Sequence, residues 1–256
     1  MIDAFFLIKN KQDWRLKIYF LMVLGVLFSL PLNKDKGIIH NLAQQSSDYL
    51  TGIDVSHHQG AIDWRKVKLQ DVNYAIVKAT EGATFVDEKF EYNWRKLNDI
   101  NMTRGAYHFF HSAVDPIEQA ANYLAVIGEL HENDLPPIVY VEVADSNANE
   151  TNEFTHNLLI FLAIIEWATR RVPILYTNQD FGHRYLQSKR LSRYTLWIAE
   201  YSETLGPLPP PWATKGWAIW QYSKQGKIDG ILTDVDLNRF RGNAEQLHEL
   251  IALSKY

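Results

Sequence analysis

The chain has 256 residues, enough for one large or two small domains, and its 46% hydrophobic and 22% charged residues are ordinary values for a globular protein. The net charge of -4 gives no global basic field of the kind that binds nucleic acid. The chain has no cysteine, which excludes disulfides, thiol catalysis and thiolate metal sites.

Residues 1–48 have the pattern of an export signal or a membrane anchor followed by a linker. Basic residues, including Arg15 and Lys17, precede an apolar run from Ile18 to Leu32. This run is short for a membrane span and long for a signal-peptide core, and no clear small-x-small cleavage site follows it. A cleaved signal, an uncleaved anchor and a buried soluble helix therefore remain open. In the first two cases, the domain that begins near residue 49 lies outside the cytoplasm.

Eight short runs after the linker have the composition of strands. Several are apolar on both faces, as in a parallel sheet that is covered on both sides. They are residues 51–58, 72–80, 104–110, 137–143, 172–178, 195–201, 216–222 and 234–240.

Helical patterns alternate with the first of these strands. They cover residues 63–69, 88–99, 115–130, 152–171 and 178–189, and a last helix covers 243–254. Asp63 and Asp115 are predicted N-caps, and Pro116 fits the first helical turn. The chain between residues 201 and 243 is rich in proline and glycine and has no helical pattern. The pattern predicts an α/β fold, an irregular TIM-like barrel of five βα units followed by three strands without helices. We expect residues 49–256 to form this single domain.

One strand ends in a carboxylate. The stretch Leu135–Asp145 reads LPPIVYVEVAD, and its β-branched residues indicate a short buried strand. A glutamate at the tip of such a strand, Glu142, is a candidate functional group, because burying an unpaired charge is costly. Tyr140 and Glu142 point to the same side, because side chains alternate along a strand. Exposure of Glu142 to solvent without any function is the alternative.

The other predicted strands also end in polar and aromatic residues. The active site of a βα barrel lies at the carboxyl ends of its strands. Carboxylates and flat rings at one mouth suit glycoside hydrolysis, which needs a proton donor, negative charge and surfaces for sugars. The strand-end residues are Asp54, Lys78–Glu81, Tyr107–Phe109, Glu142, Tyr176, Asn178, Trp197, Glu200, Trp220–Tyr222, Asp234 and Asp236.

Other chemistries fit the sequence less well. A metal site could be drawn from Asp54, His57, His58 and His108, but adjacent histidines on a strand would point to opposite sides and no HExxH helix is present. Ser56 has no GxSxG surroundings. The residues therefore favour a site without a metal ion.

Seven motifs, in order from Gly52 to Phe240, make the chain resemble glycoside hydrolase family 25, the lysozymes of the Chalaropsis and phage-endolysin type. They are GIDVSHHQG (52–60), YAIVKATEG (74–82), RGAYHFF (104–110), ILYTN (174–178), LWIAEY (196–201), WAIWQYS (217–223) and VDLNRF (235–240). The resemblance implies cleavage of the β-1,4 bond between N-acetylmuramic acid and N-acetylglucosamine in peptidoglycan, without a cofactor.

The resemblance also assigns residues. The fourth strand of the family ends in an Asp-x-Glu pair, and Glu142 matches the glutamate, the general acid/base. Asp54 and Asp236 match two further active-site carboxylates. The position of the paired aspartate, the nucleophile or orienting group, is occupied by Tyr140. A tyrosine, with a pKa near 10, is neutral at pH 7. A catalytically weakened or inactive, peptidoglycan-binding pseudoenzyme is therefore the alternative to an active lysozyme.

We expect a monomeric, exported hydrolase whose partner is peptidoglycan, with contact to a membrane only through the N-terminal segment. A related hydrolase acting on another amino-sugar polymer, such as chitin, is a further alternative. The predicted catalytic residues are Glu142, Asp54 and Asp236, and the predicted substrate-binding residues are Tyr140, Tyr107, Tyr176, Trp197, Trp220 and Gln221.

Overall fold

The computed structural model describes residues 49–142 and 151–256. The described residues belong to one compact unit, Ser47–Tyr256. The predicted signal or anchor and its linker lie outside the described residues. No helix among the residues that the structure describes is long and apolar enough to cross a membrane.

Eight strands close into the predicted barrel. Six parallel pairings join β1 through β8, and β9 pairs with both β8 and β1 and thereby closes the ring. A short additional strand, β3, forms a hairpin with the end of β2. The strands are β1 (Tyr49–Val55), β2 (Tyr74–Glu81), β3 (Phe85–Val86), β4 (Thr103–Phe109), β5 (Ile138–Tyr140), β6 (Ile174–Asn178), β7 (Thr195–Ala199), β8 (Ile219–Gly226) and β9 (Val235–Arg241).

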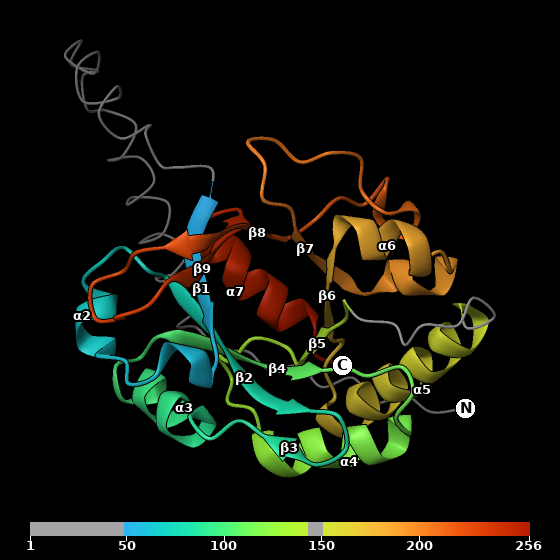
Figure 1. Cartoon of the computed structure of the whole chain (residues 1–256), viewed down its shortest axis with the longest axis horizontal. Helices are drawn as coiled ribbons and strands as arrows, with labels where there is room; N and C mark the ends of the chain where they lie inside the picture. Colours follow the sequence, from blue (N-terminus) through green and yellow to red (C-terminus); the bar gives the residue numbers. More distant parts are fainter. Residues whose placement is uncertain (1–48, 143–150) are drawn as a thin grey trace, which may run out of the picture. The chain divides into compact units, whose positions relative to one another are not determined.

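Helices follow the first five barrel strands, as the sequence predicts, and α4 and α5 pack against each other on the outside of the barrel (Figure 1). Asp63 and Asp115 cap their helices, and Pro116 occupies the first turn. The helices are α2 (Trp64–Lys68), α3 (Phe90–Asp99), α4 (Pro116–Ile127), α5 (Thr151–Thr169), α6 (Gln179–Tyr185) and α7 (Ala244–Leu253), and the 3-10 helices are η1 (His57–Gln59), η2 (Lys189–Arg193) and η3 (Pro210–Trp212).

No helix precedes the last strand, and the parallel pairing predicted for alternating strands and helices does not extend to it. β9 runs antiparallel to β8 and β1. The physical reason is the connection, because residues 227–234 contain no helix and a short link joins antiparallel neighbours. Asp236 therefore reaches the mouth of the barrel from the beginning of β9, not from its end. Asp54 and Asp236 are direct partners in the β1–β9 register.

The first predicted strand is also shorter than expected. It ends at Val55, and His57 and His58 belong to η1. Ser56 caps this turn by accepting a hydrogen bond from the backbone N–H of His58. The two imidazole rings therefore lie close together, 4.1 Å apart between centroids, where a strand would have separated them.

The core has two parts. One lies between the barrel and its helices and includes Val139, Phe161 and Leu175. The other lies within the barrel, where Ile76 and Tyr176 are fully buried. Because side chains alternate between the two faces of a strand, successive residues of each strand fill the two parts in turn. Successive inward-facing residues therefore lead up each strand to the mouth.

Candidate active site

Two carboxyl groups meet at the mouth of the barrel, Asp54 on β1 and Asp236 on β9. Asp54 is almost completely buried, and burial, followed by the charge of Asp236, raises its pKa well above the ordinary value. Burial likewise raises the pKa of Asp236, to about 6, and its hydrogen bond with Asp54 acts in the opposite direction. The two side chains are hydrogen bonded with Asp54 as the donor, so Asp54 keeps its proton when Asp236 loses its own near pH 6.

A polar network inside the barrel fixes Asp54. Its Oδ1 accepts hydrogen bonds from Gln221 Nε2 at 2.8 Å and from Asn238 Nδ2 at 2.6 Å. Trp197 Nε1 donates to Asn238 Oδ1, and the Tyr176 hydroxyl donates to Gln221 Oε1. A buried polar network of this kind is stable only when its members are satisfied, so these residues hold Asp54 in one position.

Glu142 lies two residues beyond Tyr140, the last residue of β5, and is partly exposed. Burial raises the pKa of its carboxyl group, and the charge of Asp236 acts in the same direction. Hydrogen bonding with the Asn178 and Tyr176 side chains opposes that rise. A carboxyl group whose pKa is raised stays protonated at higher pH, which is the property that a general acid requires.

Glu142 also lines a cleft of about 550 Å³ that opens between β6, α6 and the end of β7. A larger groove of about 640 Å³, between α2, α3 and the β8–β9 connection, contains none of the three carboxylates. The lining residues of the Glu142 cleft are Glu142, Asn178, Gln179, Asp180, Phe181, Arg184, Tyr185, Ala199, Glu200 and Tyr201.

Tyr140 lies in a stack of aromatic rings beneath the mouth. Its ring lies parallel to that of Tyr176, with 3.5 Å between centroids, and 5.0 Å from that of Tyr107. Burial raises the pKa of Tyr140 well above the ordinary value, and the charge of Glu142 adds to the rise. The phenol is therefore neutral throughout the physiological pH range, and Tyr140 supplies no negative charge.

The predicted sugar-binding residues fall into three groups. Tyr176, Trp197 and Gln221 are completely buried within the barrel, so they position other groups. Tyr107 and Tyr140 keep a small exposed fraction. Trp220 is almost fully buried, packs in the core between the barrel and the helices, and donates a hydrogen bond to the Glu200 carbonyl. Its neighbour Gln221 points into the barrel.

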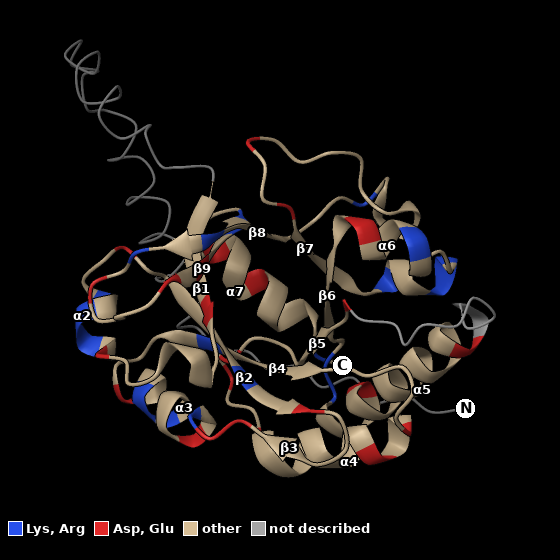
Figure 2. Ribbon diagram, in the orientation of Figure 1, with Lys and Arg blue, Asp and Glu red and all other residues tan. Residues whose placement is uncertain are grey.

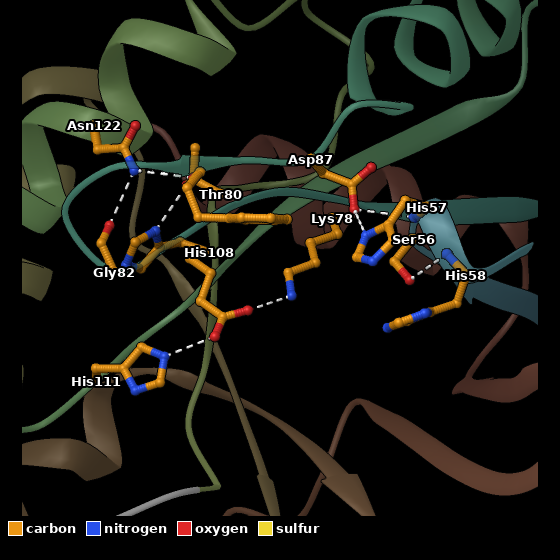
Figure 3. Close-up of polar contacts among 12 residues, drawn as sticks. Ser56, His57, His58, Lys78, Thr80, Gly82, Asp87, His108, His111 and Asn122 are labelled. Atoms are coloured by element: carbon orange, nitrogen blue, oxygen red, sulfur yellow. Dashed lines mark hydrogen bonds and ion pairs between the residues drawn. The ribbon is translucent and has the colours of Figure 1, made fainter. Parts of the chain in front are cut away.

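A second polar cluster lies on the β2–β4 side of the mouth (Figure 3). Lys78 Nζ lies 2.5 Å from Glu81 Oε2, and His111 Nε2 lies 2.8 Å from Glu81 Oε1. His57 Nδ1 lies 2.7 Å from the buried Asp87. Because its charged groups are largely paired with one another, this cluster carries little net charge.

The described residues contain no group of three or more His, Asp or Glu side chains arranged to hold a metal ion. Among the metal ligands considered from sequence, His108 is completely buried and bonded to Thr80 and Gln119, and burial lowers its pKa to about 3. Its neutral ring is therefore a component of the core.

Three further residues contact the carboxylates or their network, and of these only Asn178 is among the strand-end residues named from the sequence. Asn178 bonds Glu142, Asn238 bonds Asp54, and the half-exposed Tyr201 donates to Gln221 Oε1 at 2.7 Å. A signal for Asn238 is present in the sequence, because it lies two positions after Asp236 and shares its side of the strand. A signal for Tyr201 is present as well, because it ends the predicted strand 195–201 on the same side as Trp197, although β7 itself ends at Ala199.

Comparison with known proteins adds independent information. A family model described as "Glycosyl hydrolases family 25" matches residues 53–231. "Uncharacterized protein YegX" of Escherichia coli K12 is 33% identical over 205 residues, which cover 78% of this chain and 72% of that protein. Lysozyme M1 of Streptomyces globisporus is 31% identical over 205 residues, which cover 77% of this chain and 69% of that protein. A bacterial lysozyme structure from Streptomyces coelicolor matches with a TM-score of 0.74 and 28% identity, covering 80% of this chain and 98% of that one.

Proposed function

Because the chain belongs to glycosyl hydrolases family 25, we propose that this glycoside hydrolase is a lysozyme-type muramidase. Its substrate would be peptidoglycan. The bond that it cleaves would be the β-1,4 link between N-acetylmuramic acid and N-acetylglucosamine. Relatives named as lysozymes support this substrate class. Two observations support the assignment of Glu142 as the acid. Its carboxyl group has a raised pKa, and it lies beside an open cleft and near Asp236.

Glu142 would act first as acid and then as base. In the first step its proton moves to the glycosidic oxygen while the bond from that oxygen to the anomeric carbon breaks. In the second step the Glu142 carboxylate takes a proton from water, which forms the new bond to the anomeric carbon. The proton is thus restored and the carboxyl group returns to its initial state.

The Asp54–Asp236 pair would stabilise the positive charge that develops on the sugar. At neutral pH the pair carries at least one negative charge beside Glu142, and the hydrogen bonds of Asn238 and Gln221 orient it. Fixed charges aimed at the reacting centre need no reorganisation during the reaction, which is why they are effective.

The neutral Tyr140 favours attack by the substrate's own acetamide. A buried phenol with a raised pKa is a poor nucleophile at neutral pH. The acetamide oxygen of the sugar would form the bond to the anomeric carbon as the leaving oxygen is protonated, and water would then open the resulting ring. Tyr140 would contribute its ring to the sugar-binding surface.

Two substitutions at Tyr140 test this mechanism. Tyr140→Phe keeps the ring and its stacking but removes the hydroxyl group, so we expect turnover within a few-fold of the parent. If Tyr140 were the nucleophile, the loss would be on the order of a hundredfold or more. Tyr140→Asp introduces a carboxylate, and we expect it to raise turnover. The measurement is release of new reducing ends from purified peptidoglycan.

A catalytically silent, peptidoglycan-binding protein is the second candidate, and Tyr140 is the observation that favours it. Glu142→Gln separates the two candidates, because it removes the transferable proton while retaining size and hydrogen bonding. We expect it to abolish hydrolysis but to leave binding to insoluble peptidoglycan and the melting temperature nearly unchanged. A parent protein that binds the polymer and releases no reducing ends would instead identify the second candidate.

We further propose that residues 49–256 form the catalytic domain and that residues 1–48 direct it out of the cytoplasm as a signal or an anchor. A substrate in the cell wall requires such export, and relatives described as a lysozyme and an autolytic lysozyme are consistent with it. The domain is proposed to work as a monomer.

A further inference from the structure

One outer face of the barrel carries arginines and aromatic rings. We call the residues Tyr49, Trp217, Tyr222, Arg239 and Arg241 the basic aromatic face. They come from β1, β8, β9 and the residue that lies two positions before β8. In the described part of the chain these three strands pack chiefly against other strands, because no α-helix occurs between residues 201 and 243. Lysines and arginines are coloured blue in Figure 2.

The rings hold the two guanidinium groups in place. Arg239 lies 4.2 Å from the ring centroid of Tyr222 and 5.9 Å from that of Tyr49. Arg241 lies 5.4 Å from the ring centroid of Trp217, and the Tyr49 and Trp217 rings are stacked. Among the residues described, neither arginine forms an ion pair with a carboxylate. The positive charges of this face are therefore available to an anion.

A small groove continues the basic aromatic face toward the amino-terminal end of the barrel, opposite the mouth. Its volume is about 270 Å³, and Arg193, Lys215 and Arg241 contribute its charge. Arg193 is paired with Glu166, whereas Lys215 and Arg241 have no such partner among the described residues. Gly216, with φ at 82°, lets Arg241 lie directly against the backbone. The lining residues are Ser192, Arg193, Tyr194, Thr195, Leu196, Trp212, Lys215, Gly216, Trp217, Ala218, Arg241 and Leu250, none of which is acidic.

We propose that the basic aromatic face and this groove dock on an anionic phospholipid surface. Arginine binds phosphate through paired N–H donors, and tryptophan and tyrosine favour the boundary between lipid and water. The position of the face indicates lipid as the occupant. Tyr49 belongs to it, and the chain that leads into Tyr49 carries the basic residues and the apolar run Ile18–Leu32. Only 16 residues, 33–48, separate that run from Tyr49, a reach of at most about 55 Å.

This attachment would orient the enzyme. Tyr49 begins β1 and Asp54 lies five residues further on, about 17 Å away along an extended strand. Docking through the end of the barrel that holds Arg241 leaves the mouth, with Glu142 and Asp236, pointing away from the lipid. The cleft would then open toward polymer beyond the membrane.

Vesicle co-sedimentation of residues 47–256 tests the proposal. This unit lacks the apolar run, and the Streptomyces coelicolor lysozyme, 98% of whose chain matches this chain, indicates that such a unit folds by itself. The vesicles contain phosphatidylglycerol and phosphatidylcholine, or phosphatidylcholine alone. The test variant is Arg239→Gln/Arg241→Gln. The matched control is Arg65→Gln/Arg95→Gln, which removes two exposed arginines from α2 and α3.

We expect binding to the phosphatidylglycerol vesicles only, an affinity about thirtyfold lower in the test variant, and little change in the control. Inorganic phosphate at constant ionic strength should not displace the protein. Equal losses in the two double variants would overturn the proposal, because they would indicate attraction by net charge alone. Displacement by inorganic phosphate, or absence of vesicle binding by a folded parent, would also overturn it. Hydrolysis of soluble peptidoglycan fragments should be the same in all three proteins.

Discussion

At the scale of single residues, the site combines carboxyl groups that cannot all be ionised together. Asp54 and Asp236 are adjacent across β1 and β9, and the charge of Asp236 raises the cost of ionising both Asp54 and nearby Glu142. Desolvation and like charge thus separate the pKa values of the carboxyl groups, which is how one site supplies both an acid and a stabilising anion. Tyr140 adds no charge to this set, and its ring stacks on that of Tyr176.

The Asp236 carboxyl gives a prediction about stability and pH. Its pKa is 3.8 in the reference state and about 6 in the folded protein, so the folded state binds more protons and stability falls as the pH rises through this interval. Asp236→Asn removes the effect. Two pKa units would correspond to about 3 kcal/mol, which partial exposure reduces to roughly 1–2 kcal/mol. We expect the variant to be more stable than the parent by that amount at pH 7.5 and equal to it near pH 4.

Urea denaturation at the two pH values measures this difference in the free energy of unfolding. A variant that is less stable than the parent at pH 7.5, or a difference independent of pH, would contradict the pKa assigned to Asp236. Activity should also fall in the variant, because the stabilising charge is altered.

At the scale of elements, the sequence predicts the eight strands and most of the helices because their apolar runs and caps are local signals. The direction of β9 and the turn at His57 and His58 depend on connections and capping bonds, which the composition of a strand does not encode. The strand-end rule predicts that Asp54 and Glu142 lie at the mouth of the barrel. It could not distinguish Trp220, which faces outward, from Gln221, which faces inward, because the register becomes certain only when the neighbouring strands are in place.

Gly52 in β1 gives a prediction at this scale. A Cβ atom there would lie 2.2 Å from the ring of Tyr74, which is completely buried. Gly52→Ala should therefore lower the free energy of unfolding by about 1–3 kcal/mol, because a packed core cannot accommodate the added methyl group. Thermal denaturation measures the loss. The control is Gly206→Ala, where the nearest atom is 3.5 Å away and little change is expected. Similar melting temperatures for the two variants would mean that Tyr74 can move.

At the scale of the whole molecule, the two ends of the barrel have different roles. The carboxylates collect at the mouth, whereas the opposite end holds a buried ion pair between Arg104 and Asp134, with Nε and Oδ1 2.7 Å apart. Arg171 joins it by donating to the Asp134 carbonyl. Residues at that end of such a barrel contribute to stability, and residues at the mouth to chemistry. Sequence patterns predicted the closed barrel but not this pairing, which joins residues that are 30 positions apart.

Asp134→Ala tests this division of roles. Removing the carboxylate leaves the Arg104 guanidinium buried with only a backbone carbonyl and His131 as polar contacts, and we expect a loss of about 3–5 kcal/mol. The kcat of the folded fraction should be unchanged. Asp99→Ala, which breaks the exposed pair with Lys96, is the control and should cost less than about 1 kcal/mol. If Asp134→Ala lowered kcat without any loss of stability, this would contradict the proposed division of roles between the two ends of the barrel.

The identity of the sugar at the newly formed reducing end tests the proposed function most directly. Purified peptidoglycan is digested with residues 47–256 and with the Glu142→Gln variant, the products are reduced with borohydride, and mass spectrometry identifies the terminal sugar. We predict reduced N-acetylmuramic acid from the parent and no new ends from the variant. Reduced N-acetylglucosamine, or undiminished release by Glu142→Gln, would contradict the proposed bond or the proposed acid.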